Sequence, residues 1–436
     1  MNIENLHNNL PKRIPAEICD RIQFFLRSNA DQQMRFVIYL GQNIDVAVLR
    51  KAFRLTILSE PIFSYTYKEE KNQVYWQKQE AIDSTTLIDL VDNVKDVADE
   101  VNHFLTLTIS PFDFPIVKAR IIRAGKKDVL CINMNHTPTD GAGLKEFVKI
   151  LACNYSKLIL NPDYTCAANI KGDRSIKQVT NSFTLSQKIQ FLKQGFKKPG
   201  KASTWAFNWN KSVDDNQNQF VTTRMSSEIF DKIKAFGKLN KATLNDLILA
   251  AFIRAFLTTG PDNSITSKPI IVPVDLRKYI KPRHNSAICS LTGSLICNIG
   301  VDTGLTFKDT LEKVCKEMKY KKEIHAEMHM LAPQLMLAKL VPYAKLKEKT
   351  MQHKMPPIPL VTNVGIISPS DINFGGIHID YSYITGAICY GNYFCMGYSS
   401  FNKEITFSIG FTGSNLQIQK VKMFLDSFKA ELEKIS

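Results

Sequence analysis

Apolar side chains recur at helical spacing in several segments of this 436-residue chain. Between residues 45 and 59 they return every three or four positions, which predicts a helix with one buried face. The final helix should follow Ser414 and Gln417, whose spacing indicates a capping box. The same periodicity predicts helices over residues 94–105, 142–160, 226–239 and 243–257, and two helices within residues 306–348.

Short runs of β-branched and aromatic residues separate these helices. Runs of this kind, bounded by turn-forming residues, are typical of strands. Helices and strands that alternate along a whole chain favour an α/β layered architecture (α+β). The predicted strands cover residues 62–67, 116–123, 129–135, 220–225, 268–276 and 291–299, with a strand-rich region over residues 358–411.

The length of the chain suits two domains of roughly 150 to 220 residues each. Residues 161–218 differ from their surroundings, because they are polar and contain prolines, glycines and lysines. We interpret residues 171–218 as a crossover between an N-terminal domain, residues 1–170, and a C-terminal domain, residues 219–436.

Composition places the chain among globular proteins, with 44% apolar and 22% charged residues. No stretch approaches the roughly 18 apolar residues that span a bilayer, and the N-terminus has no apolar signal region. We therefore expect a cytoplasmic protein with no membrane span. The nine cysteines form no C-x-x-C pair, which favours reduced thiols over a disulfide framework or a zinc site.

The net charge of +15 favours partners that carry phosphate or acidic groups. Nucleic acid is one such partner, but the chain lacks zinc-finger spacing, an aromatic RNA-binding signature and a basic recognition helix. A nucleotide-bearing cosubstrate such as coenzyme A and an acidic carrier protein fit the charge equally well. A lysine-rich surface that only keeps the protein soluble is the remaining alternative.

Residues 133–143 read NMNHTPTDGAG and lie where a predicted strand gives way to a predicted helix. A neutral imidazole at that position, His136, can take a proton from a hydroxyl or amine that attacks an acyl carbon. Asp140 and Gly141 follow at a spacing that suits a tight turn into the helix. A core histidine beside a turn-forming Asp-Gly is the alternative interpretation.

Other motifs carry little support. His325 and His329 share a helix face but lack a zinc-protease pattern, so we expect no metal site. Residues 425–427 match a phosphopantetheine attachment site only in part and fall within a predicted helix. No phosphate-binding loop, dinucleotide fingerprint or serine-esterase motif is present.

The sequence resembles the chloramphenicol-acetyltransferase-like superfamily nearly end to end. This superfamily includes condensation domains of nonribosomal peptide synthesis, acyl-CoA-dependent transferases and alcohol acetyltransferases, which share an H-x-x-x-D-G motif. The motif corresponds here to residues 136–141. The resemblance also rests on PFDFPIVKARIIR, KATLNDLILAAFIRAF, IIVPVDLR, LTGSLICNIG and VTNVG.

The resemblance implies two chloramphenicol-acetyltransferase-like lobes that form a pseudo-dimer with a tunnel between them, in a monomeric chain. It also implies that His136 is the general base, that Asp140 is structural and that Arg277 is its buried partner. Thr362 and Asn363 are expected near the tunnel and, together with Asn135, are expected to bind substrate. Asn135 stands where condensation domains carry a second histidine, which favours plain acyl transfer.

The function expected from these features is transfer of an acyl group from a thioester to a small-molecule alcohol or amine. The cosubstrate is an acyl-CoA or a phosphopantetheine-linked acyl thioester on a carrier protein, and no cofactor is held permanently. A non-catalytic relative that binds an acyl carrier or a partner protein is the alternative.

Overall fold

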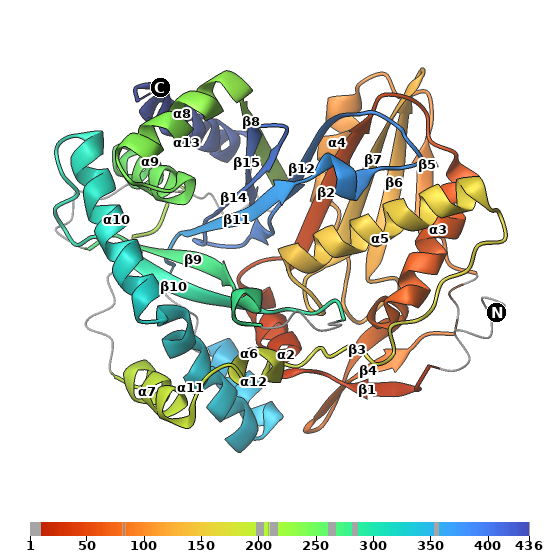
Figure 1. The fold of residues 1–436 in the computed structure, drawn as a ribbon, viewed down its shortest axis with the longest axis horizontal. Coiled ribbons are helices and arrows are strands. Elements are labelled where there is room, and N and C mark those ends of the chain that lie inside the picture. Colours follow the sequence, from red (N-terminus) through yellow and green to blue (C-terminus); the bar gives the residue numbers. More distant parts are fainter. Residues whose placement is uncertain are drawn as a thin grey trace.

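The computed structural model describes residues 10–80, 82, 84–197, 205–207, 209, 217–259, 267–280, 287–352 and 357–435. Two large β-sheets, each with its own helices, lie side by side (Figure 1). A small third sheet lies below the first. This arrangement confirms the mixed α/β architecture expected from the sequence.

A five-stranded sheet carries the N-terminal part of the chain, in the order β12-β2-β7-β6-β5. Its neighbours run antiparallel, except β5 and β6. Strand β12 comes from the C-terminal part of the chain and pairs with β2. Distant parts of the sequence therefore share this sheet. Its strands are β2 (Gln33–Leu40), β5 (Ile88–Val91), β6 (Val117–Ala124), β7 (Lys127–Asn135) and β12 (Ile379–Thr385).

Helices cover both faces of this sheet. Side chains along a strand point alternately to the two faces, so successive residues pack against different helices. Phe36 and Ile38 join the core that includes α3 and α5, whereas Val37 between them packs with α4. Phe147 of α5 meets Phe53 of α3 edge to face, with ring centroids 5.5 Å apart. The helices are α3 (Val46–Ser59), α4 (Val97–Thr106) and α5 (Gly141–Leu160).

The second large sheet has the order β10-β9-β11-β14-β15-β13, and β8 also pairs with β15. Strand β11 runs parallel to β14 and to β9, and the other pairs in this sheet, apart from β13 with β15, are antiparallel. Its strands are β8 (Asn218–Met225), β9 (Pro269–Asp275), β10 (Thr292–Asn298), β11 (Leu360–Ile367), β13 (Ile388–Cys389), β14 (Cys395–Phe401) and β15 (Glu404–Thr412).

A helix whose middle, residues 247–253, is apolar on all sides lies at the centre of the second core. Phe252 and Phe256 of this helix, α9, are buried and contact Phe424 of α13. A helix without a polar face must be covered on every side, and here the sheet and three helices do so. The helices are α8 (Ser227–Leu239), α9 (Leu244–Thr259), α10 (Phe307–Glu323) and α13 (Asn415–Glu433).

The lower part of the molecule combines the small sheet, ordered β1-β4-β3, with short helices (Figure 1). Its strands are β1 (Arg13–Pro15), β3 (Tyr65–Glu70) and β4 (Gln73–Lys78). Its helices are α2 (Ile18–Phe25), α6 (Lys177–Thr180), α7 (Leu185–Gly195), α11 (Ala326–Leu340) and α12 (Tyr343–Gln352), with 3-10 turns η1 (Leu26–Ser28), η2 (Pro61–Ser64), η3 (Leu276–Tyr279) and η4 (Pro369–Ile372).

Two local predictions were wrong. The strand expected from residue 62 begins at Tyr65, because Pro61 starts the 3-10 turn η2. Residues 306–348 form parts of three helices instead of two. His325 takes a left-handed conformation, φ 52°, between α10 and α11. Pro342 then separates α11 from α12, since the residue before a proline avoids the helical region.

Most predicted elements were confirmed, including the capping box of Ser414 and Gln417. The crossover predicted for residues 171–218 contains α6 and α7, which the sequence analysis did not anticipate, and part of it lies outside the described residues. Its boundaries stay a prediction. Within the described ranges, no helix is long and apolar enough to cross a membrane.

Candidate active site

His136 lies at the junction between β7 and α5. Strand β7 is buried between β2 and β6, and its last residue, Asn135, donates its backbone N–H to Ile116 O at 2.9 Å. The backbone N–H of His136 donates to Gln32 O at 2.8 Å. These two hydrogen bonds fix the main chain at and just before His136, the residue that the sequence predicts to be the base.

Both polar atoms of the Asn135 side chain form hydrogen bonds with the backbone of neighbouring residues. Its Nδ2 donates to Ile109 O at 3.0 Å, and its Oδ1 accepts from the Thr137 N–H at 2.9 Å. The residue is 1% exposed. A contact between Asn135 and substrate stays a prediction.

The imidazole of His136 is held in its neutral form. Burial lowers its pKa, and nearby backbone groups of His136 and Thr139 and the charge of Asp140 offset this only in part. Its Nδ1 is buried and forms no hydrogen bond with any residue that the structure describes. The residue as a whole is partly exposed. A neutral imidazole is the form that a general base requires.

Asp140 caps α5 and faces the second half of the chain. Its Oδ1 accepts from the Gly143 N–H at 3.0 Å, and its Oδ2 accepts from Arg277 Nη1 at 2.9 Å. Oδ2 also accepts from Leu291 N at 2.7 Å and from Thr292 Oγ1 at 3.1 Å. Burial raises the pKa of Asp140, but Arg277 and the backbone N–H donors outweigh it and hold the pKa below its ordinary value.

Arg277 belongs to η3, which follows β9 of the second sheet. Its Nη2 donates to Cys289 O at 2.7 Å, and its Nη1 also lies 3.2 Å from Asp275 Oδ1. These contacts with Cys289 and Asp275 orient the guanidinium towards Asp140. The ion pair joins the first sheet's motif to the second sheet's edge.

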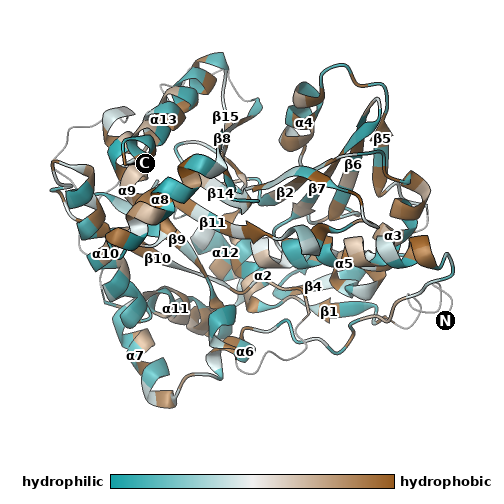
Figure 2. Cartoon of the chain, turned by 45° about the horizontal axis from the view of Figure 1, so that its top comes forward, coloured by the Kyte–Doolittle hydropathy of each residue, from teal (hydrophilic) through white to brown (hydrophobic). Residues whose placement is uncertain are grey.

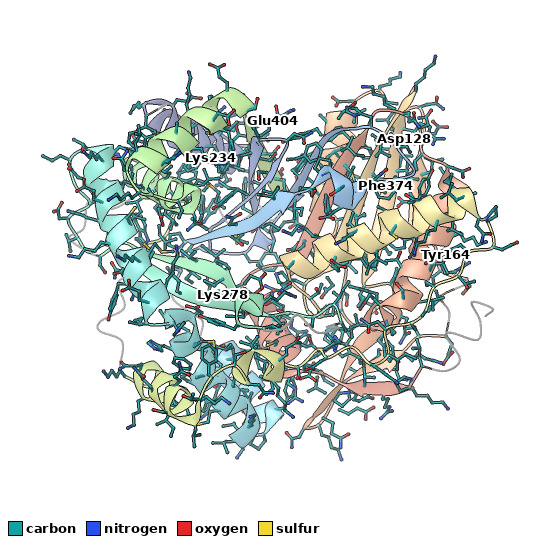
Figure 3. All side chains as sticks on the ribbon, viewed as in Figure 1. Asp128, Tyr164, Lys234, Lys278, Phe374 and Glu404 are labelled. Atoms are coloured by element: carbon teal, nitrogen blue, oxygen red, sulfur yellow. The ribbon has the colours of Figure 1, made fainter. Side chains whose placement is uncertain are left out.

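Buried contacts on the other side of η3 hold this turn in place. Lys278 lies beside β10 (Figure 3), and its Nζ is 2.6 Å from Glu327 Oε1. The hydroxyl of Tyr279 donates to the same oxygen at 2.5 Å. Burial raises the pKa of Glu327, but these two donors outweigh it, so the pKa is lowered and the carboxylate stays charged.

A second ion pair, between Arg174 and Asp20, was not predicted from the sequence and also contacts the motif. Arg174 forms two hydrogen bonds with Asp20, at 3.0 and 3.2 Å. The same guanidinium donates to Pro138 O at 3.0 Å, inside the motif, and to Ile288 O at 3.2 Å. The presence of an arginine in a polar segment was the only sequence signal for this contact.

Two glycines at the start of α5 allow neighbouring side chains to lie close to the helix backbone. A Cβ on Gly143 would lie 1.8 Å from Thr139 Oγ1 and 2.9 Å from Ile288 Cγ2, so a side chain does not fit there. A Cβ on Gly141 would lie 2.9 Å from Val364 Cγ1 of β11. Figure 1 shows this end of α5 against β11.

Thr362 and Asn363 precede the residue that faces Gly141. Strand β11 has an irregularity between Asn363 and Gly365, where Asn363 Oδ1 accepts from the Gly365 N–H at 2.8 Å. Neither side chain bonds to His136 within the described residues. The structure thus brings His136, Asp140, Gly141 and Arg277 together, and it places Thr362 and Asn363 on β11 just before Val364, the residue that faces Gly141.

No protein-family model matches the sequence, and no curated protein matches it. Solved structures do match over nearly the whole chain. The epimerization domain from the third module of tyrocidine synthetase B is 12% identical with TM-score 0.68, covering 97% of this chain and 96% of its own.

Two further matches have related architectures. The trichothecene 15-O-acetyltransferase from Fusarium sporotrichioides is 13% identical with TM-score 0.67, covering 97% of this chain and 95% of its own. The starter condensation domain of rhizomide synthetase, solved with C8-CoA and Leu-SNAC, is 11% identical with TM-score 0.66, covering 97% of this chain and 94% of its own. The chain has the chloramphenicol-acetyltransferase-like fold. This fold, with two lobes, confirms the expectation drawn from the sequence motifs.

Proteins with this fold differ in the reaction that their names state, from epimerization to acetyl transfer. A fold alone does not fix a reaction, which must be argued from the site. What the likeness to these solved structures establishes here is the fold alone.

Proposed function

We propose that this protein transfers an acyl group from a thioester to a small alcohol or amine, with His136 as the general base. The donor is an acyl-CoA or an acyl group on the phosphopantetheine of a carrier protein. Both substrates reach His136 through a tunnel between the two lobes. Thr362 and Asn363 line that tunnel opposite the motif.

The observation that carries the proposal is the division of roles between His136 and Asp140. Burial keeps the imidazole neutral, so it can accept a proton near pH 7. Both oxygens of Asp140 are occupied by Gly143, Arg277, Leu291 and Thr292. Asp140 therefore holds the loop in shape, and His136 alone carries the proton.

The reaction balances without a covalent enzyme intermediate. His136 takes the proton of the acceptor hydroxyl or amine while the oxygen or nitrogen bonds to the thioester carbonyl carbon. The carbon–sulfur bond then breaks, and the proton passes from the imidazolium to the departing thiolate. Holding the two substrates and the base in one geometry supplies much of the rate enhancement.

The donor class has two kinds of support. A net charge of +15 suits a phosphate-bearing thioester or an acidic carrier. A structurally similar condensation domain was solved with C8-CoA, which shows that this scaffold accommodates an acyl-CoA in that protein.

The test is to incubate the purified chain with acyl-CoA donors of different chain length, with and without alcohols and amines. Mass spectrometry of the products and release of free thiol are then measured. Acceptor-dependent thiol release with a matching acylated product supports the proposal. Tight binding of acyl thioesters without any product would favour the non-catalytic alternative.

A further inference from the structure

Helix α7 exposes a row of apolar side chains. Leu185, Ile189 and Phe196 are 74%, 44% and 51% exposed. Their spacing of four and seven residues places them on one face of the helix and of the turn that continues it. Phe191, on a different face, is 3% exposed and contacts the ring of His325, just before α11, and the ring of His329 of α11. The buried face explains why α7 is docked, but not why the outer face is apolar.

The chain around α7 is basic and contains no acidic residue. Residues 174–213 include seven lysines and one arginine, and no aspartate or glutamate. At 100° per residue, Lys193 and Lys197 lie on one side of the apolar row and Lys188 on the other. A row of apolar side chains with lysines on both flanks is the pattern of a helix that lies in a membrane interface.

Helix α11, which packs against α7, also carries exposed apolar side chains. A Cβ on Gly195 would lie 2.4 Å from Pro333 Cγ, so the end of α7 is packed against the middle of α11. One and two turns further along α11 come Leu337, 38% exposed, and Leu340, 72% exposed, next to the exposed Lys339. Figures 1 and 2 place α7 and α11 together at the outer edge of the molecule, and Figure 2 shows brown and teal segments along α7.

We propose that this face docks on the surface of an anionic lipid bilayer. The basic apolar face, defined as Leu185, Ile189, Phe196, Leu337 and Leu340 with their neighbouring lysines, would insert its apolar side chains at the level of the acyl chains. The lysines would reach the lipid phosphates. Such docking needs no membrane-spanning helix.

The charge pattern favours a lipid surface over a protein partner. The flanking charges within residues 174–213 all have one sign, so they form no alternating pattern that would select one protein surface. A bilayer needs no matched pattern, because anionic lipids move laterally to the lysines. Each lysine near such a surface strengthens binding by roughly fivefold.

The experiment is co-sedimentation of the full chain with vesicles. One set is phosphatidylcholine alone, and the other is phosphatidylcholine and phosphatidylglycerol in equal parts. The chain should sediment with the second set and not with the first. Lys193→Glu with Lys197→Glu should lower the partition coefficient by roughly tenfold or more, and Leu185→Ser with Phe196→Ser should also lower it strongly.

The matched control replaces exposed apolar residues elsewhere. Leu416 and Met423 of α13 are 56% and 65% exposed, and Leu416→Ser with Met423→Ser should leave vesicle binding unchanged. All variants change surface residues, so an unchanged melting temperature shows that they are folded. Failure of the wild-type chain to bind anionic vesicles, or equal binding by the α7 variants, overturns the proposal. Loss of self-association in the α7 variants with vesicle binding intact would show a protein interface instead.

Discussion

The carboxylate of Asp140 lies 2.9 Å from the guanidinium of Arg277, which is 137 positions further along the chain. The two side chains are 4% and 22% exposed, and they link the first turn of α5 to the edge of the second sheet. Removing one member of such a buried pair leaves the other charge without compensation. Replacing both removes the charges together.

A double-mutant cycle follows from this geometry. Asp140→Asn and Arg277→Met should each lower the free energy of unfolding by about 3 to 5 kcal/mol. The double variant should lose much less than the sum of the two single losses. Urea unfolding of the four proteins measures this, and strict additivity would show that the pair does not act as a unit.

The start of α5 should tolerate no side chain at Gly143. Gly143→Ala places a methyl group against Thr139 Oγ1 and Ile288 Cγ2, and this overpacking should cost about 1 to 3 kcal/mol. Adding Thr139→Ala should recover part of the loss, because Thr139 Oγ1 is the nearest obstacle.

A second glycine provides the control for Gly143. A Cβ on Gly386 would lie 3.7 Å from Cys395 Sγ, an ordinary contact, so Gly386→Ala should cost less. Thermal unfolding compares the variants. Equal losses at both positions would mean that the close contact at Gly143 is not the cause.

Local patterns predicted the segment that carries His136. A run of strand-forming residues, an Asp-Gly pair and a helical repeat were enough to place the imidazole at a strand-to-helix junction. Arg277 came from the family resemblance, since nothing near it in sequence points to Asp140. The contacts of Arg174 with Asp20 and of Gly141 with Val364 join residues more than 150 positions apart, and no local pattern encodes them.

Local sequence patterns also failed to predict how distant parts of the chain pair in the fold. Apolar periodicity predicted most helices and strands, because each must bury one face. It did not predict that β12, from the second half of the chain, pairs with β2, because periodicity does not report which distant strand a segment pairs with. It also missed α7, whose outer face is apolar and exposed and thus gives no simple amphipathic signal.

The pH profile of the reaction should reflect the buried imidazole. Burial lowers the pKa of His136 from the ordinary value of 6.5, so the ring stays neutral at lower pH than a free histidine. Activity requires the neutral form, and kcat/KM should therefore fall only below pH 6.5. An acid limb with an apparent pKa clearly above 6.5 in the folded enzyme would contradict this assignment.

One chain supplies both lobes of the fold, so we expect the protein to be monomeric in solution. Light scattering across a range of protein concentrations should give the mass of a single chain, 49.4 kDa. A stable trimer at all concentrations would mean that the lobes within one chain do not complete the site.

The role of His136 as general base is tested most directly by His136→Ala. A general base contributes typically about 10²- to 10⁴-fold, so acceptor-dependent thiol release should fall by that factor while the melting temperature stays close to that of the wild type. His378, whose side chain is 82% exposed, provides the matched control, and His378→Ala should keep full activity. Turnover by His136→Ala at the wild-type rate would remove His136 from the mechanism.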